Sequence, residues 1–154
     1  SRIILEKLFG TLTEKKIGIL GFAFKANTND TRESPAIQIC KNLLEEGCYL
    51  SIYDPKVDAT QILNDLNIEN FNDGNRLENS VLVETFSSVM DSVVNSDAIV
   101  ILTDWEEFYD LKLEAVYELM RPPCWIFDTR NVIDIQRAKS FGFNVWKLGN
   151  GKFQ

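Results

Sequence analysis

Apolar and polar positions in this chain of 154 residues form two kinds of segment that follow one another in turn. The first kind is a short, continuous apolar run, which is typical of a strand buried on both faces of a parallel sheet. These runs predict strands at residues 16–20, 49–53, 81–85, 98–102, 124–127 and 143–146.

The second kind of segment carries apolar residues at helical spacing between the runs. The best-marked helix begins after Ser34, a good N-cap residue, has Pro35 at its first position and ends at Gly47. Residues 69–80 are polar and predict an exposed loop or insertion. Further helices are predicted at residues 1–10, 59–66, 87–94, about 104–120 and 133–141.

Strands that alternate with helices predict a particular fold class. We expect a three-layer, doubly wound (Rossmann-like) α/β domain with a mainly parallel sheet of about six strands. In such a sheet, ligands bind outside the carboxyl ends of the strands. The loops that leave these ends are therefore the place to look for function.

The first of these loops follows the strand at 16–20. Gly21 interrupts the apolar run, Lys25 and Arg32 bring two cations, and the loop ends at the helix cap Ser34. A strand end, a helix N-terminus and an arginine suit an anion such as a phosphate, although a solvated or salt-bridged pair is the alternative. The sequence GFAFK after the strand is not GxGxxG, which argues against a dinucleotide pyrophosphate in this turn.

The other strand ends carry acids. Asp54 could bind a ribose, but it lies 33 positions after Gly21, beyond the usual spacing, and Asp-Pro favours turn capping instead. Asp128 and Arg130 could pair with each other, or Arg130 could face a ligand; the pattern leaves both open.

Aromatic residues follow the fourth strand. Trp105 and Phe108 have a spacing that favours packing on a helix face over stacking with a base. The roles of Asp104 and Asp128 are not fixed by the sequence.

Composition narrows the classes of function. Hydrophobic residues make up 45% and charged residues 25%, as in soluble globular proteins, and a net charge of −7 argues against general nucleic-acid binding. No apolar run is long enough for a membrane span, and no signal peptide is visible.

The three cysteines form no CxxC pair and the chain has no histidine. This argues against a zinc site and excludes catalytic Ser-His and Cys-His pairs. We expect buried free thiols in a reducing compartment, and therefore a cytoplasmic location.

Three segments resemble one known family. They are GFAFKANTNDTRESPAI, ILTDWEEF and IFDTRN, in this order, and together they span most of the chain. They resemble the C-terminal, UDP-binding domain of the UDP-glucose/GDP-mannose dehydrogenase family. The tryptophan in TDWEEF suits the branch of that family that acts on UDP-glucose.

The resemblance implies an NAD-dependent enzyme that oxidises the C6 alcohol of UDP-glucose twice, to UDP-glucuronate. In this family an N-terminal domain binds NAD and a long central helix mediates dimerisation, so a homo-oligomer is expected for the full-length protein. Residues 1–14 would then be the end of the linker or central-helix region, and residues 15–154 the UDP-sugar-binding domain.

Carried over by motif, Phe24, Lys25 and Arg130 would contact the UDP-sugar, with Lys25 near the pyrophosphate. Arg32 would reach the NAD phosphates across the domain interface. The family's catalytic cysteine, catalytic lysine and GxGxxG lie upstream of these motifs, and no cysteine here matches the catalytic motif. The chain alone is expected to be inactive. The alternatives are another nucleotide-sugar dehydrogenase, acting on UDP-N-acetylmannosamine or GDP-mannose, or a stand-alone nucleotide-binding module without catalysis.

Overall fold

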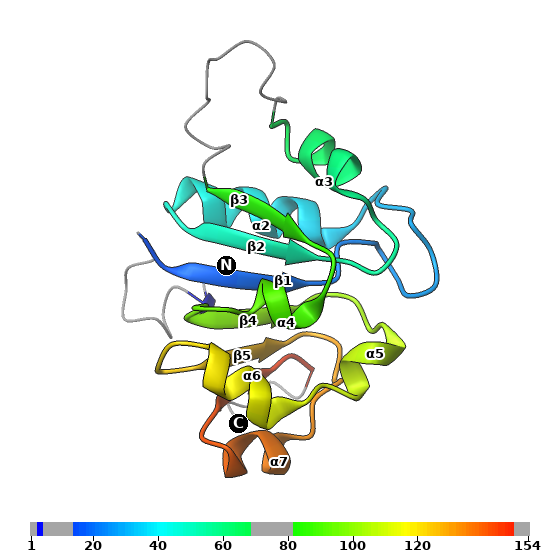
Figure 1. Ribbon diagram of the computed structural model, residues 1–154. Coiled ribbons are helices and arrows are strands. Elements are labelled where there is room, and N and C mark those ends of the chain that lie inside the picture. The colour runs from blue at the N-terminus through cyan, green and yellow to red at the C-terminus, as the bar shows by residue number, and fades with distance from the viewer. Residues whose placement is uncertain (1–2, 5–13, 69–81, 150–154) are drawn as a thin grey trace.

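A six-stranded sheet forms the centre of the part of the chain that the computed structural model describes, namely residues 3–4, 14–68 and 82–149 (Figure 1). Its strand order is β3-β2-β1-β4-β5-β6, and every neighbouring pair is parallel. This confirms the predicted fold class. The strands are β1 (Lys16–Leu20), β2 (Tyr49–Tyr53), β3 (Val83–Phe86), β4 (Ala98–Ile101), β5 (Trp125–Asp128) and β6 (Asn144–Lys147).

The four inner strands are apolar because helices cover both faces of the sheet. In Figure 1, α2 lies behind the sheet while α4 and α6 lie in front of it. The helices are α2 (Pro35–Glu45), α3 (Ala59–Asp65), α4 (Val89–Ser92), α5 (Glu106–Tyr109), α6 (Leu113–Leu119) and α7 (Ile135–Ser140). As predicted, Ser34 caps α2, with its side chain accepting a hydrogen bond from the Ala36 N–H, and Pro35 is the first helical residue.

The helix predicted over about 104–120 is two short helices instead. α5 ends at Tyr109 and α6 begins at Leu113. Phe108 and Leu111 are buried before the break, and Leu113 and Val116 after it. One continuous helix would put Leu113 on a different face from Phe108 and Leu111, because the two sets are out of phase with a period of 3.6 residues. The break lets both sets reach the core.

The cysteines are buried free thiols, as predicted. Burial raises the pKa of Cys40 far above its ordinary value, and raises that of Cys48 to about 12. Of the predicted N-terminal helix, only Ile3 and Ile4 are described, and both are helical; the predicted loop at 69–80 lies outside the described residues. In the described ranges, no helix has the length and apolar character needed to cross a membrane.

Candidate functional site

The carboxyl ends of all six strands lie on one edge of the sheet, at the right of Figure 1, because the sheet is wholly parallel. The chain order reverses between β1 and β4, so the connections from these two strands lead away on opposite sides. Such a switch point leaves a crevice outside the strand ends and is where α/β domains bind ligands. The loops after β1, β4 and β5 meet around it.

Asp54, the residue after β2, ties three of these strand ends together. One carboxylate oxygen, Oδ2, accepts hydrogen bonds from the N–H groups of Phe22 (2.7 Å) and Ala23 (2.9 Å) and from the Trp105 indole (3.2 Å). The other, Oδ1, accepts from the N–H groups of Lys56 (2.8 Å) and Val57 (3.0 Å). The residue is only 7% exposed. Turn capping was the favoured interpretation of Asp54, and the structure confirms it.

Two hydroxyl groups hold the same loop from other sides. The Ser34 Oγ donates to the Phe22 carbonyl (2.7 Å), and the Thr103 Oγ1 donates to the Ala23 carbonyl (2.8 Å). Gly21 packs directly on Thr103: it has a φ of +97°, and a Cβ at this position would lie 2.5 Å from the Thr103 side chain. The backbone of Gly21 to Ala23 is therefore fixed immediately before Phe24 and Lys25.

Phe24 and Lys25 extend this fixed backbone. Phe24 is partly buried, and its N–H donates to the Asp30 carbonyl (3.0 Å), which closes the loop. The Lys25 side chain is exposed, with its ammonium 5.4 Å from the centre of the Phe24 ring. Within the described part of the chain, no carboxylate lies within ion-pair distance of Lys25, although its charge makes a small contribution to the lowered pKa of Asp30. The exposed ammonium is therefore open to an anion from solvent.

Arg32 is paired inside its own loop. Its Nε lies 3.0 and 3.3 Å from the two Asp30 carboxylate oxygens, and its Nη2 lies 2.8 Å from Oδ2. The hydrogen bond from Arg32 lowers the pKa of Asp30 to about 2. The Arg32 side chain is nevertheless 89% exposed. The structure thus places Arg32 at the outer surface of the loop.

Arg130 and Asp128 do not pair through their charges. Asp128 is fully buried and its carboxylate accepts the N–H groups of Arg130, Val132 and Ile133 at 2.8–3.0 Å, with the Lys147 ammonium 3.5 Å away. The Arg130 guanidinium instead lies 3.3 Å from Asp104, at the end of the neighbouring strand β4. Of the two interpretations left open, a charge pair with Asp128 is therefore wrong.

Trp105 and Phe108 are packing residues, as favoured. Both are buried, and Phe108 meets Tyr53 edge-on at 6.2 Å between ring centres. The Tyr53 hydroxyl donates to Glu107, and burial together with this carboxylate raises the pKa of the tyrosine. Sequence reasoning missed the link from Trp105 to Asp54 and the one from Tyr53 to Glu107, and no local pattern signals either.

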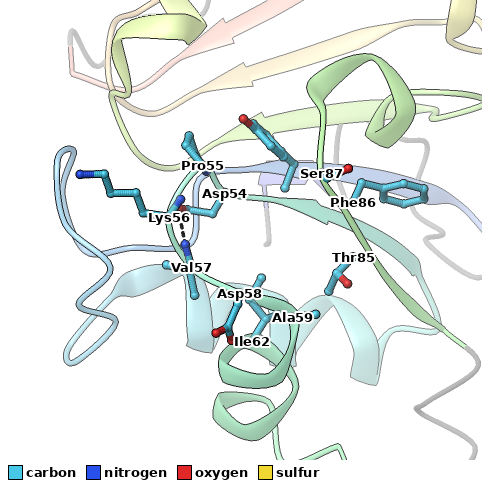
Figure 2. A pocket seen from close by; sticks show the side chains of 11 residues that line it. Asp54, Pro55, Lys56, Val57, Asp58, Ala59, Ile62, Thr85, Phe86 and Ser87 are labelled. Carbon is cyan, nitrogen blue, oxygen red and sulfur yellow. Dashed lines mark hydrogen bonds between the residues drawn. The ribbon is translucent and has the colours of Figure 1, made fainter.

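Described residues line two hollows on this edge. One, of about 480 Å³, lies between the β2–α3 connection and the end of β3, and Figure 2 shows Lys56, Asp58, Thr85 and Ser87 around it. The other, of about 460 Å³, is lined by Tyr53, Trp105 and three acids of the α5 region. Neither is lined by Phe24, Lys25 or Arg130. These three residues lie on loops from β1 and β5, on either side of the end of β4, and no hydrogen bond joins Lys25 to Arg130.

One known protein family matches most of the chain. A model of the UDP-binding domain of the UDP-glucose/GDP-mannose dehydrogenase family matches residues 18–135. The chain belongs to this family. The match includes the end of β1, the loop with Lys25 and Arg32, and the Asp128–Arg130 turn, so the resemblance found in the sequence is confirmed.

Members of the UDP-glucose/GDP-mannose dehydrogenase family are similar over the whole chain. The UDP-glucose 6-dehydrogenases of Drosophila melanogaster and Caenorhabditis elegans are 44% and 43% identical over 100% and 98% of the chain. A solved UDP-N-acetylmannosamine dehydrogenase from Pyrococcus horikoshii is 29% identical over 94% of the chain, with a TM-score of 0.65; the chain covers 28% of that structure. The chain spans about a third of the two enzymes, 32% and 31% of their lengths.

Proposed function

We propose that this chain is the UDP-sugar-binding domain of a UDP-glucose 6-dehydrogenase, which oxidises UDP-glucose to UDP-glucuronate with NAD. The observation that carries the proposal is the 44% identity, over every residue of the chain, to an enzyme of that name. The solved enzyme named for UDP-N-acetylmannosamine is more distant, at 29%.

In this proposal Phe24, Lys25 and Arg130 contact the UDP-sugar. Lys25 supplies a charge toward the pyrophosphate, because its ammonium is exposed and has no carboxylate partner among the described residues. Arg130 supplies a planar donor group suited to phosphate oxygens. The fixed backbone before Phe24 supports this role, since a preorganised loop loses little entropy on binding.

NAD is proposed to bind mainly to a separate N-terminal domain, where it would accept hydride from the sugar. The first strand exit here does not suit a dinucleotide: Ala23 and Ala26 stand where a GxGxxG that begins at Gly21 would have its second and third glycines, and the Asp54 carboxylate is already occupied. Only Arg32 is proposed to reach the NAD phosphates, from its exposed position. Residues 1–14 are proposed to end a linker and residues 15–154 to form the UDP-sugar domain.

The chemistry of this chain is accordingly binding and orientation. It would neutralise the pyrophosphate and hold the sugar toward a catalytic centre supplied by the rest of the enzyme, and a homo-oligomer is proposed for that full-length protein. The chain alone should not oxidise UDP-glucose, because its sequence holds no GxGxxG and no match to the family's catalytic cysteine motif.

Two measurements test the proposal. The full-length protein should reduce NAD with a higher kcat/KM for UDP-glucose than for UDP-N-acetylmannosamine or GDP-mannose. A preference for one of the latter would identify that nucleotide sugar as the substrate in place of UDP-glucose. An upstream region of the full-length protein without a dinucleotide-binding motif would favour a non-catalytic module.

Calorimetry on the 154-residue chain tests the site itself. UDP should bind weakly, and Lys25→Ala should weaken binding further because a charge near the pyrophosphate is lost. Lys56→Ala is the matched control, since Lys56 is an exposed lysine of the same sheet edge that lines the hollow of about 480 Å³, which Lys25 does not line. Equal heats for wild type and Lys25→Ala would refute the assignment of Lys25.

A further inference from the structure

The three cations of the site differ in how they are neutralised. Arg32 is held by two oxygens of Asp30, and Lys25 has no ion-pair partner among the described residues. Arg130 is intermediate: one nitrogen, Nη2, lies 3.3 Å from one oxygen of Asp104. A guanidinium has five N–H donors, so this single contact leaves most of them free.

Both members of this pair start from fixed backbone. Asp104 lies between Thr103 and Trp105, whose buried side chains bond to Ala23 and Asp54. The Arg130 N–H is held by the Asp128 carboxylate. The two side chains therefore meet without large losses of backbone entropy.

Asp104 is the carboxylate that faces the Arg130 guanidinium from the neighbouring strand end. Asp128, the other nearby acid, is occupied by three backbone N–H groups and by Lys147. The side chains of Arg130 and Asp104 are 33% and 37% exposed, so the pair is open to solvent and exchangeable. A partly exposed pair with a single 3.3 Å contact is weak, which means that a more highly charged anion can replace the carboxylate.

We propose that Asp104 is a built-in competitor for Arg130, and that the nucleotide diphosphate binds by displacing this carboxylate from the guanidinium. This inference rests on the proposed function, because it takes Arg130 as a contact of the UDP-sugar. Its consequence is selectivity: any anion must overcome the same negative charge, so a diphosphate succeeds where singly charged anions do not. Asp104 thus sets the affinity without contacting the ligand favourably.

The test is calorimetry of UDP binding to the full 154-residue chain. Asp104→Asn keeps the size and an acceptor oxygen but removes the charge, and we expect UDP to bind about three- to tenfold more tightly. Uridine, which carries no phosphate, should bind equally to both proteins. Asp110→Asn is the matched control, since it removes an exposed acid after α5 that makes no contact with Arg130.

A double-mutant cycle shows whether the effect passes through Arg130. In an Arg130→Ala background, Asp104→Asn should change UDP affinity by less than twofold, because no guanidinium remains to be released. Unchanged or weaker UDP binding by Asp104→Asn, or equal tightening by Asp110→Asn, would overturn the inference and leave the proposed function standing. If neither the wild type nor Asp104→Asn binds UDP, both the proposed site and this inference are refuted.

Discussion

Replacing Asp54 with asparagine should destabilise the domain far more than a change of one atom suggests. The carboxylate accepts five hydrogen bonds and has no donor of its own. An asparagine amide has one acceptor oxygen and one NH₂ group. In its better orientation the oxygen keeps the contacts to Phe22, Ala23 and Trp105, while the NH₂ group faces the N–H groups of Lys56 and Val57.

Two donors would then lose their acceptor and meet another donor. Leaving the buried Val57 N–H unsatisfied costs about 1–3 kcal/mol, and leaving the partly buried Lys56 N–H unsatisfied costs about 1 kcal/mol because water can reach it, so Asp54→Asn should lower the free energy of unfolding by about 2–4 kcal/mol. The domain's total stability is expected to be about 5–15 kcal/mol, so the loss is a large fraction of it. The variant should still fold, with a clearly lower urea midpoint.

Urea unfolding followed by circular dichroism measures this loss. Asp58→Asn is the matched control, because Asp58 is the exposed N-cap of α3 and bonds to one N–H, that of Gln61. Asparagine caps helices as well as aspartate, so this variant should change stability by less than about 0.5 kcal/mol. If Asp54→Asn lowered the free energy of unfolding no more than Asp58→Asn did, at an unchanged m-value, the stabilising role of the Asp54 hydrogen bonds between strand ends would be refuted.

Two further predictions concern titration and reactivity. Carbon-detected NMR should find the Asp30 carboxyl titrating near pH 2. Because its pKa is lowered, the pairing with Arg32 is complete above about pH 4 and is lost as the pH falls through about 2. Arg32→Ala should return the pKa of Asp30 toward 3.8. A normal midpoint in the wild type would contradict the ion pair. Cys40 and Cys48, whose buried thiols have raised pKa values, should resist a thiol reagent in the native chain and react fully in denaturant; rapid native labelling would show that the core opens.

The strands could be predicted from the sequence because buried parallel strands are continuous apolar runs with clear ends. All six predicted runs became strands, with ends shifted by at most about two residues. The break between α5 and α6 was missed because each half has helical spacing and only the phase between the halves differs. Phase is decided by where the core lies, which is a property of the assembled sheet.

The site was predictable at the level of loops but not of contacts. The parallel sheet brings the loops after β1, β4 and β5 to one edge, so their polar residues were expected together. The Asp104–Arg130 pair joins residues 26 positions apart, and the Trp105–Asp54 bond joins residues 51 apart. Such pairings depend on strand order and on side-chain rotamers, and the local spacing of residue types along the sequence predicts neither.

The occupied carboxylate of Asp54 has a practical meaning for protein engineering. In a dinucleotide-binding domain, an acid near the end of the second strand accepts hydrogen bonds from a ribose. Here an acid at the same kind of position accepts hydrogen bonds from the protein's own loops instead. A designer who wished to graft a dinucleotide site onto this scaffold would have to free that acid. Because its donors come from three strand exits, each step toward a new cofactor would loosen the loop that presents Lys25.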